Sequence, residues 1–183
     1  MSKFADRKGK ALLVIDVQNG VVEDAWHRDE VIENINTLVT KAREAKTPVI
    51  WIQHSSKGME IGTEGWQIVS ELKPLSSESV IQKRYRSSFE ETELEETLAN
   101  LGAGHLYICG AQTNNCVRHT SHAALERGYD VTLVKDAHTT SDGSGESGTL
   151  LAESIVDEAN RAFRQYELPG RSASIVATEE VSF

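Results

Sequence analysis

Three residues of this sequence could together carry out nucleophilic catalysis: Cys116, Lys83 and Asp16. Each of them follows an apolar stretch of the chain. Cys116 lies between the apolar run 105–109 and an amphipathic segment that ends at Gly128, which predicts a strand-to-helix connection at the thiol. Free backbone N–H groups and the helix dipole at such a connection favour the thiolate, so the position suits a nucleophile. The alternative is a cysteine that only packs, since free cysteine is often buried.

Asp16 ends the apolar run 12–15, where a buried strand would deliver a side chain to a ligand. A carboxylate at the edge of a core needs a hydrogen bond, a cation or a proton, and each of these shifts its pKa. The simpler alternative is an aspartate that caps the following turn, helped by Gln18 and Asn19.

Lys83 follows the short apolar piece 80–82 and opens the basic segment 83–86. Such a segment is usually a solvated face of the protein. If Asp16 and Cys116 lie close together, however, their negative charges repel, and a lysine between them would stabilise both anions.

The elements that must position these residues alternate along the chain. Apolar runs without polar alternation, at 11–17, 49–53, 106–109 and 131–134, predict buried parallel strands, and apolar residues at helical spacing separate them. This rhythm predicts an α/β fold: a Rossmann-like three-layer α-β-α sandwich with a mostly parallel central sheet. Ligands of such sheets bind at the carboxyl ends of the strands.

Two segments interrupt this rhythm, 55–79 and 139–148, and both are rich in glycine and serine. They are candidates for pocket walls or lids, and the alternative is that they are ordinary surface connections. Because no repeat or linker divides the chain, we expect residues 1–183 to form one domain.

Composition narrows the classes of partner. The chain carries 28 acidic residues against 19 Lys plus Arg, a net charge of -9, which argues against a nucleic-acid partner. No apolar run reaches the length of a membrane span, and the polar first ten residues do not resemble a signal peptide, so we expect a cytoplasmic protein with no membrane partner. A disulfide between Cys109 and Cys116 would be geometrically awkward and disfavoured in the cytosol.

The combination of motifs, rather than any one of them, resembles the isochorismatase-like cysteine hydrolases. Asp16 stands in hydrophobic-Asp-x-Gln-Asn, Lys83 follows a short strand, and Cys116 stands in Gly-x-x-Thr-x-x-Cys-Val. An Asp-Ala pair at 136–137 after a strand also matches, and the resemblance covers about residues 11–140.

The resemblance implies a catalytic triad of Asp16, Lys83 and Cys116. In such a triad the aspartate accepts the thiol proton, the lysine stabilises the negative charge and the thiolate attacks a carbonyl carbon. The resemblance also implies that backbone N–H groups of Gln112 and Cys116 bind the oxyanion, aided by a non-proline cis peptide between Ala111 and Gln112.

Two departures from the family pattern concern metal binding. The nicotinamidase branch of that family has an Asp-x-His metal site after the second strand, whereas the matching stretch here has His54 without an acidic ligand. His119 and His122 are spaced as two metal ligands on a helix could be, but no acidic partner is near them in the sequence. We therefore expect the metal-independent branch, with no metal and no cofactor.

A third departure concerns the substrate pocket. Family members often read Gln-Asn-Asp-Phe after the first strand, whereas this chain reads Gln-Asn-Gly-Val at 18–21 and so lacks that aromatic wall. The aromatic candidates to replace it are Trp66, Tyr85 and Phe89, although each could equally be a core residue. We also assign Gln18, His54 and His119 to the predicted pocket.

Three functions remain open. The first is a cysteine amidohydrolase that cleaves a C–N bond of a small amide, ureido, carbamoyl or lactam compound through a thioester. The second is isochorismatase-type cleavage of a vinyl ether, and Cys116 favours the first because isochorismatases of this family can act without that cysteine. The third is a non-catalytic small-molecule binding protein. We expect a small-molecule substrate and, from the resemblance, a homodimer or homotetramer in which a neighbouring chain could complete the pocket.

Overall fold

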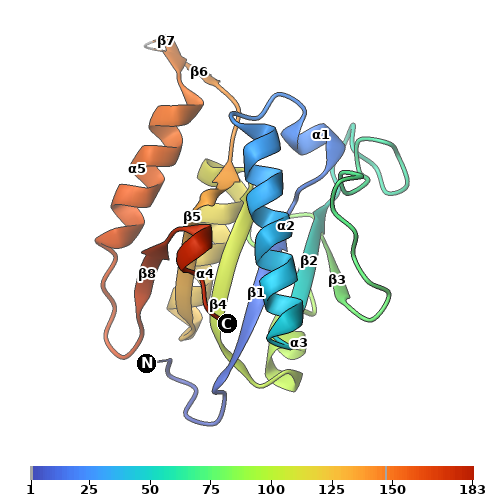
Figure 1. The fold of residues 1–183 in the computed structure, drawn as a ribbon. Helices are drawn as coiled ribbons and strands as arrows, with labels where there is room; N and C mark the ends of the chain where they lie inside the picture. The colour runs from blue at the N-terminus through green and yellow to red at the C-terminus, as the bar shows by residue number, and fades with distance from the viewer. Residues whose placement is uncertain (1, 147) are drawn as a thin grey trace.

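A six-stranded, all-parallel sheet forms the centre of the computed structural model, which describes residues 2–146 and 148–183. The strands lie in the order β3-β2-β1-β4-β5-β8 (Figure 1). Their bounds are β1 Gly9–Ile15, β2 Val49–His54, β3 Ser79–Lys83, β4 Ala103–Ala111, β5 Asp130–Thr139 and β8 Ala173–Val176. From β1 the chain adds β2 and β3 toward one edge of the sheet, and from β4 it adds β5 and β8 toward the other edge. The strand order therefore reverses between β1 and β4, which is where doubly wound sheets bind ligands.

Helices cover both faces of this sheet (Figure 1). Helix α2 (Arg28–Glu44) packs on the face to which Leu12 and Val14 of β1 point. The alternate residues Leu13 and Ile15 point to the other face, which is covered by α3 (Leu94–Asn100), α4 (Arg118–Arg127) and α5 (Ala152–Arg164). Because both faces are buried, the strands read as continuous apolar runs, and the predicted three-layer sandwich is confirmed.

Short elements complete the fold. They are α1 (Asn19–Val22), a π-helical turn η1 (Thr113–Val117), the hairpin β6 (Gly143–Gly145) and β7 (Gly148–Leu150), and a 3-10 turn η2 (Thr178–Glu180). The hairpin stands above the first turn of α5 in Figure 1, and it overlaps the segment 139–148, which was a candidate lid or a surface connection. Within the part of the chain that the structure describes, no helix is both long and apolar enough to cross a membrane.

Strand β5 is longer than the predicted run 131–134, and it ends at Thr139. Its register with β4 shifts between Ile108 and Gly110, so that Gly110 pairs with His138. The extension matters for function because it brings a buried histidine beside the turn that carries Cys116.

Candidate active site

Asp16, Lys83 and Cys116 meet at the carboxyl edge of the sheet. The Nζ atom of Lys83 lies 2.6 Å from Oδ2 of Asp16 and 3.2 Å from Sγ of Cys116. Asp16 and Lys83 are buried, with 1% and 2% of their surface exposed, whereas Cys116 is partly exposed. The structure therefore brings together the three residues that the sequence analysis singled out.

Backbone geometry at the switch point makes this meeting possible. A Cβ atom on Gly110 would lie 2.1 Å from the carbonyl oxygen of Ile15, so only glycine lets the end of β4 lie this close to the end of β1. Asp16 follows β1 with a φ of 50°, a left-handed conformation that aspartate adopts more readily than most residues. The chain therefore turns sharply at the carboxylate and leaves it beside the segment that follows β4.

Gln18 fixes the end of β2 rather than lining the cavity. Its side chain is fully buried and donates hydrogen bonds to the carbonyl oxygens of His54 (3.0 Å) and Trp66 (2.7 Å). Its Oε1 atom accepts a hydrogen bond of 2.8 Å from the backbone N–H of His54. Gln18 thus connects the chain after β1 to the end of β2 and to the loop that follows β2, so we revise its predicted role from pocket wall to structural support.

Lys83 has two further partners. Its ammonium donates to the carbonyl oxygen of Tyr85 at 3.1 Å and contacts Nδ1 of His54 at 3.3 Å. Burial and the charge of Lys83 lower the pKa of His54, so its ring is neutral and Nδ1 accepts from the ammonium. With these partners and Asp16, the ammonium is held in one position against the sulfur.

The electrostatics of Cys116 differ from the sequence-based expectation. Burial, followed by the negative charge of Asp16, raises the pKa of the thiol to about 12, although Lys83 opposes the shift. Cys116 lies in η1, before α4 begins at Arg118, and burial outweighs any favourable dipole. The resting sulfur therefore holds its proton and needs a base in order to react.

Asp16 is suited to be that base. Burial raises the pKa of its carboxyl, and the neighbouring Lys83 opposes this shift. A carboxylate with a raised pKa binds a proton more strongly than an exposed aspartate, yet the ammonium at 2.6 Å stabilises the ionised form. Asp16 can therefore accept a proton from the thiol and return it later.

A cavity of about 390 Å³ opens onto these residues. Asp16, His54 and Cys116 line it together with Gln112, and the peptide bond between Ala111 and Gln112 is cis, as the resemblance implies. Residues 56–59 also line it, and they belong to the segment 55–79 that was a candidate pocket wall. The rest of the wall was not predicted from the sequence, and it consists of Gly20, Val21, Arg86 and Asn115.

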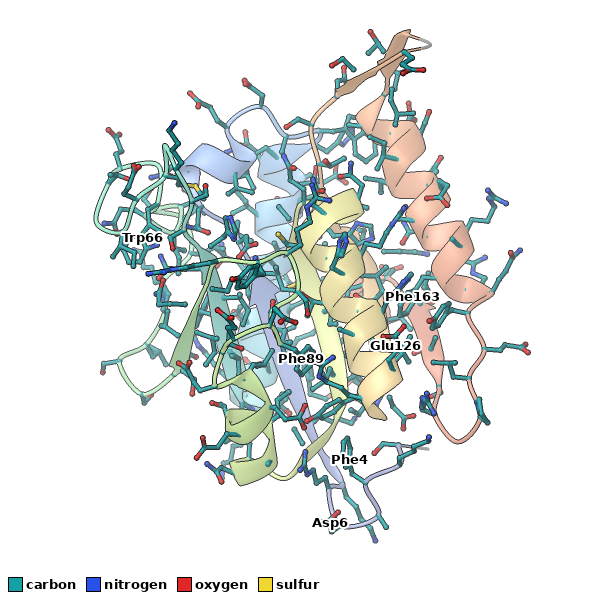
Figure 2. The ribbon with its side chains drawn as sticks, turned by 180° about the vertical axis from the view of Figure 1, so that it is seen from behind. Phe4, Asp6, Trp66, Phe89, Glu126 and Phe163 are labelled. Carbon is teal, nitrogen blue, oxygen red and sulfur yellow. The ribbon has the colours of Figure 1, made fainter. Side chains whose placement is uncertain are left out.

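The predicted aromatic wall is absent from this cavity's lining. Phe89 is 7% exposed and packs in the core near Tyr129. Trp66 lies in the loop after β2, and its carbonyl oxygen accepts hydrogen bonds from the side chains of Gln18 and Gln53. Figure 2 labels both Phe89 and Trp66. Tyr85 is exposed on a neighbouring surface depression, and His119 is exposed with Nδ1 2.8 Å from the carbonyl oxygen of Asn115. Of the predicted pocket side chains, His54 alone lines the cavity among the described residues.

A buried polar chain holds the turn that carries Cys116. His138 is 1% exposed, and its Nδ1 lies 2.9 Å from the hydroxyl of Thr113 while its Nε2 lies 3.0 Å from Oδ1 of Asn160. The amide of Asn160 donates to the carbonyl oxygen of Lys135, so its Oδ1 is left to accept from the histidine, and the Thr113 hydroxyl donates to Nδ1. The turn is thereby tied to both β5 and α5.

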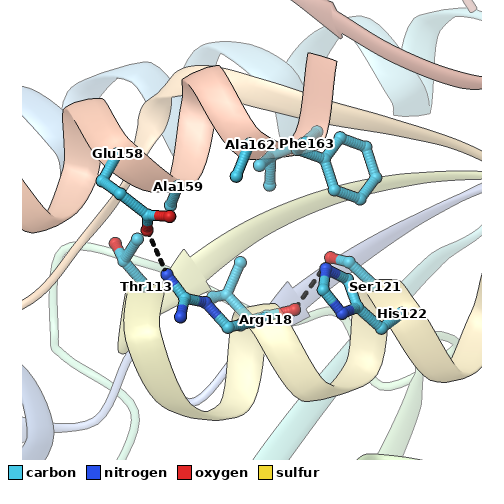
Figure 3. A pocket seen from close by; sticks show the side chains of 10 residues that line it. Thr113, Arg118, Ser121, His122, Glu158, Ala159, Ala162 and Phe163 are labelled. Carbon is cyan, nitrogen blue, oxygen red and sulfur yellow. Dashed lines mark hydrogen bonds and ion pairs between the residues drawn. The ribbon is translucent and has the colours of Figure 1, made fainter. Parts of the chain in front are cut away.

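A second, smaller cavity of about 180 Å³ lies behind this turn, between α4 and α5 (Figure 3). Its walls are largely apolar, including Val117 and Phe163, and an ion pair between Arg118 and Glu158 lies beside it. Cys116 does not line this smaller cavity, whereas it does line the first one.

Metal-ligating side chains are not clustered in the described parts of the chain. Nowhere there do three or more His, Cys, Asp or Glu side chains gather in a group that could hold a metal ion. His119 and His122 have different partners, because His119 bonds the backbone of Asn115 in η1 and His122 stacks on Tyr166 at 4.8 Å.

Comparison with known proteins places this site in a family. The family model described as the isochorismatase domain matches residues 10–168. Streptothricin hydrolase from Streptomyces noursei is 33% identical over 145 residues, which make up 75% of this chain and 57% of that protein, so the match spans little more than half of its length. Ureidoacrylate amidohydrolase from Cronobacter sakazakii is 28% identical over 169 residues, covering 69% of this chain and 73% of that protein.

A solved structure agrees with these matches along nearly the whole chain. An isochorismatase from Pseudomonas putida KT2440 superposes with a TM-score of 0.87 at 28% identity, covering 97% of this chain and 92% of that chain. The family match includes the strands that carry Asp16 and Lys83 as well as the turn that carries Cys116. The chain therefore belongs to the isochorismatase family.

Proposed function

We propose that this hydrolase cleaves a C–N bond of a small amide, ureido, carbamoyl or lactam compound through a thioester on Cys116. The observation that supports this most directly is the position of the Lys83 ammonium, 2.6 Å from the carboxylate of Asp16 and 3.2 Å from the sulfur, beside one cavity. Two relatives whose names describe a hydrolase and an amidohydrolase agree with this chemistry.

In the first half of the reaction, Asp16 takes the proton of the Cys116 thiol as the sulfur attacks the carbonyl carbon. The tetrahedral oxyanion accepts hydrogen bonds from the backbone N–H groups of Gln112 and Cys116. Asp16 then gives its proton to the leaving nitrogen, the C–N bond breaks, and the amine departs from a thioester.

In the second half, a water molecule attacks the thioester while Asp16 accepts one of its protons. The C–S bond breaks, the acid product forms, and the sulfur regains its proton from Asp16. Lys83 stabilises the negative charge on whichever of Asp16 and Cys116 holds it, which a buried site requires.

The test is a screen for ammonia or amine release over primary amides, ureido compounds, carbamoyl compounds and lactams. We expect Cys116→Ala to lower turnover of any substrate found by at least about 10³-fold, because it removes the nucleophile of both steps. Cys109→Ala is the matched control, because Cys109 is the other free cysteine and is fully buried in β4. We expect this substitution to leave turnover unchanged.

Full activity in Cys116→Ala would contradict the proposal. If the retained activity were cleavage of a vinyl ether, it would support the isochorismatase alternative. If the wild type and Cys116→Ala both bound a ligand and neither formed a product, the result would support the binding-protein alternative.

A further inference from the structure

Two cationic side chains line the wall of the Cys116 cavity. Lys57 lies in the loop after β2, and Arg86 lies in the segment after β3. Within the described residues, neither side chain has an ion pair or hydrogen bond. Asp16 is the one acidic residue that lines the same cavity in the described chain, and it is already paired with Lys83.

Both side chains are exposed, and both line the same cavity. Some other arginines of the described chain are neutralised by an acidic neighbour, because Arg28, Arg43 and Arg118 pair with Glu71, Glu78 and Glu158 respectively. Two cations without an acidic partner in one cavity create a local positive potential that attracts an anion.

We propose that the substrate carries a carboxylate, which Arg86 and Lys57 bind while the scissile carbonyl lies at Cys116. This inference rests on the proposed C–N hydrolysis and narrows its substrate class to small amido or ureido acids. The planar guanidinium of Arg86 presents paired donors that match a carboxylate, and Lys57 adds a second positive charge.

The remaining wall sets the size and character of the middle of such a molecule. Val21 and Met59 contribute apolar surface to the lining of the same cavity. The volume of about 390 Å³ is near the lower end of the range for small-molecule sites, so the substrate is compact. A short hydrocarbon link that joins a carboxylate to an amide or ureido group fits this description.

The experiment compares paired probes that differ only in charge: succinamate with butanamide, and N-carbamoylglycine with ethylurea. Binding to the Cys116→Ala protein is measured by calorimetric titration, so that it does not depend on turnover. We expect each anionic probe to bind at least about tenfold more tightly than its neutral partner, with the difference shrinking as salt rises from 0.05 to 0.5 M.

In the Cys116→Ala background, Arg86→Gln is expected to abolish this preference, while Arg84→Gln is expected to keep it. Arg84 is the matched control because it belongs to the same basic segment, is exposed and does not line this cavity. In the active protein, Arg86→Gln should raise KM for an anionic substrate by about 10- to 100-fold, whereas Arg84→Gln should leave that KM unchanged.

Equal affinity for both members of each pair would overturn the inference, as would a preference that Arg86→Gln does not change. Cysteine-dependent turnover of neutral amides alone would overturn this inference and leave the proposed function intact. Selective binding of the anionic probes without hydrolysis of any C–N compound would overturn the proposed function instead, while the anion site itself would be supported.

Discussion

The ion pair between Asp16 and Lys83 leads to the most specific prediction about stability. Lys83→Met leaves Asp16 buried without a cation, and at 2.6 Å the lost attraction is about 6 kcal/mol with an effective dielectric constant of 20. The carboxylate can avoid this loss by taking a proton. From the ordinary pKa of 3.8, protonation at pH 7 costs about 4 kcal/mol, which limits the electrostatic part of the destabilisation.

The cost of protonating Asp16 falls as the pH falls, so the destabilisation in Lys83→Met depends on pH. At pH 5 protonation of Asp16 costs about 1.6 kcal/mol, so we expect Lys83→Met to lose about 4 kcal/mol of unfolding free energy at pH 7 and about 1.6 kcal/mol at pH 5. The double variant Asp16→Asn, Lys83→Met removes both charges and should be several kcal/mol more stable than the sum of the single effects predicts.

The assay is urea unfolding of the wild type, both single variants and the double variant at pH 7 and pH 5. A coupling energy below about 0.5 kcal/mol at pH 7 would refute the reasoning, because it would mean that the two charges do not depend on each other in the folded protein. A loss in Lys83→Met of equal size at both pH values would refute the protonation argument alone.

Three further predictions concern titration. In a Cys109→Ala background, the rate of Cys116 alkylation by iodoacetamide should rise about tenfold for each pH unit between 7 and 10, because the pKa of the thiol is raised to about 12. Lys83→Met should lower this rate further. A rate that reaches a plateau by pH 8 would contradict the raised pKa. The acid limb of kcat/KM should lie above pH 3.8, because turnover needs ionised Asp16 and burial raises its pKa; a limb at or below 3.8 in the pH profile would be inconsistent with this role. Burial lowers the pKa of His138 from 6.5 to about 4, so the unfolded chain takes up a proton that the folded protein refuses, and stability should fall by about 3 kcal/mol as pH drops from above 6.5 to below 4. His138→Gln should flatten that dependence in unfolding experiments, and an unchanged slope would rule out this assignment.

Most of the fold could be predicted because both faces of its sheet are buried. Strands between two helical layers must be apolar on both sides, and four of the six strands show this in their sequence. Strand β8 (Ala173–Val176) escaped prediction because it is a short edge strand with a serine, and its residues are only half-buried. The end of β5 escaped because Lys135, Asp136 and His138 interrupt the apolar pattern.

The meeting of Asp16, Lys83 and Cys116 could be anticipated because each follows an element that ends at the same edge of a parallel sheet. The pKa of Cys116 could not, because it depends on burial that three separate segments produce together. The contact that holds the loop after β2 in place was equally unpredictable. Gln18 holds that loop by donating a hydrogen bond to the backbone carbonyl oxygen of Trp66. Every residue type has this carbonyl group, so the sequence of the loop does not reveal the contact.

The claim that Cys116 is the nucleophile can be tested on the protein itself during turnover. The wild-type protein is mixed with the best C–N substrate from the screen, quenched in acid within one turnover, digested and analysed by mass spectrometry. We expect the peptide containing Cys116 to gain the mass of the acyl group, and we expect Asp16→Asn to give no such adduct. Turnover at the full rate with this peptide unmodified throughout, and at the same rate in Cys116→Ala, would contradict the account.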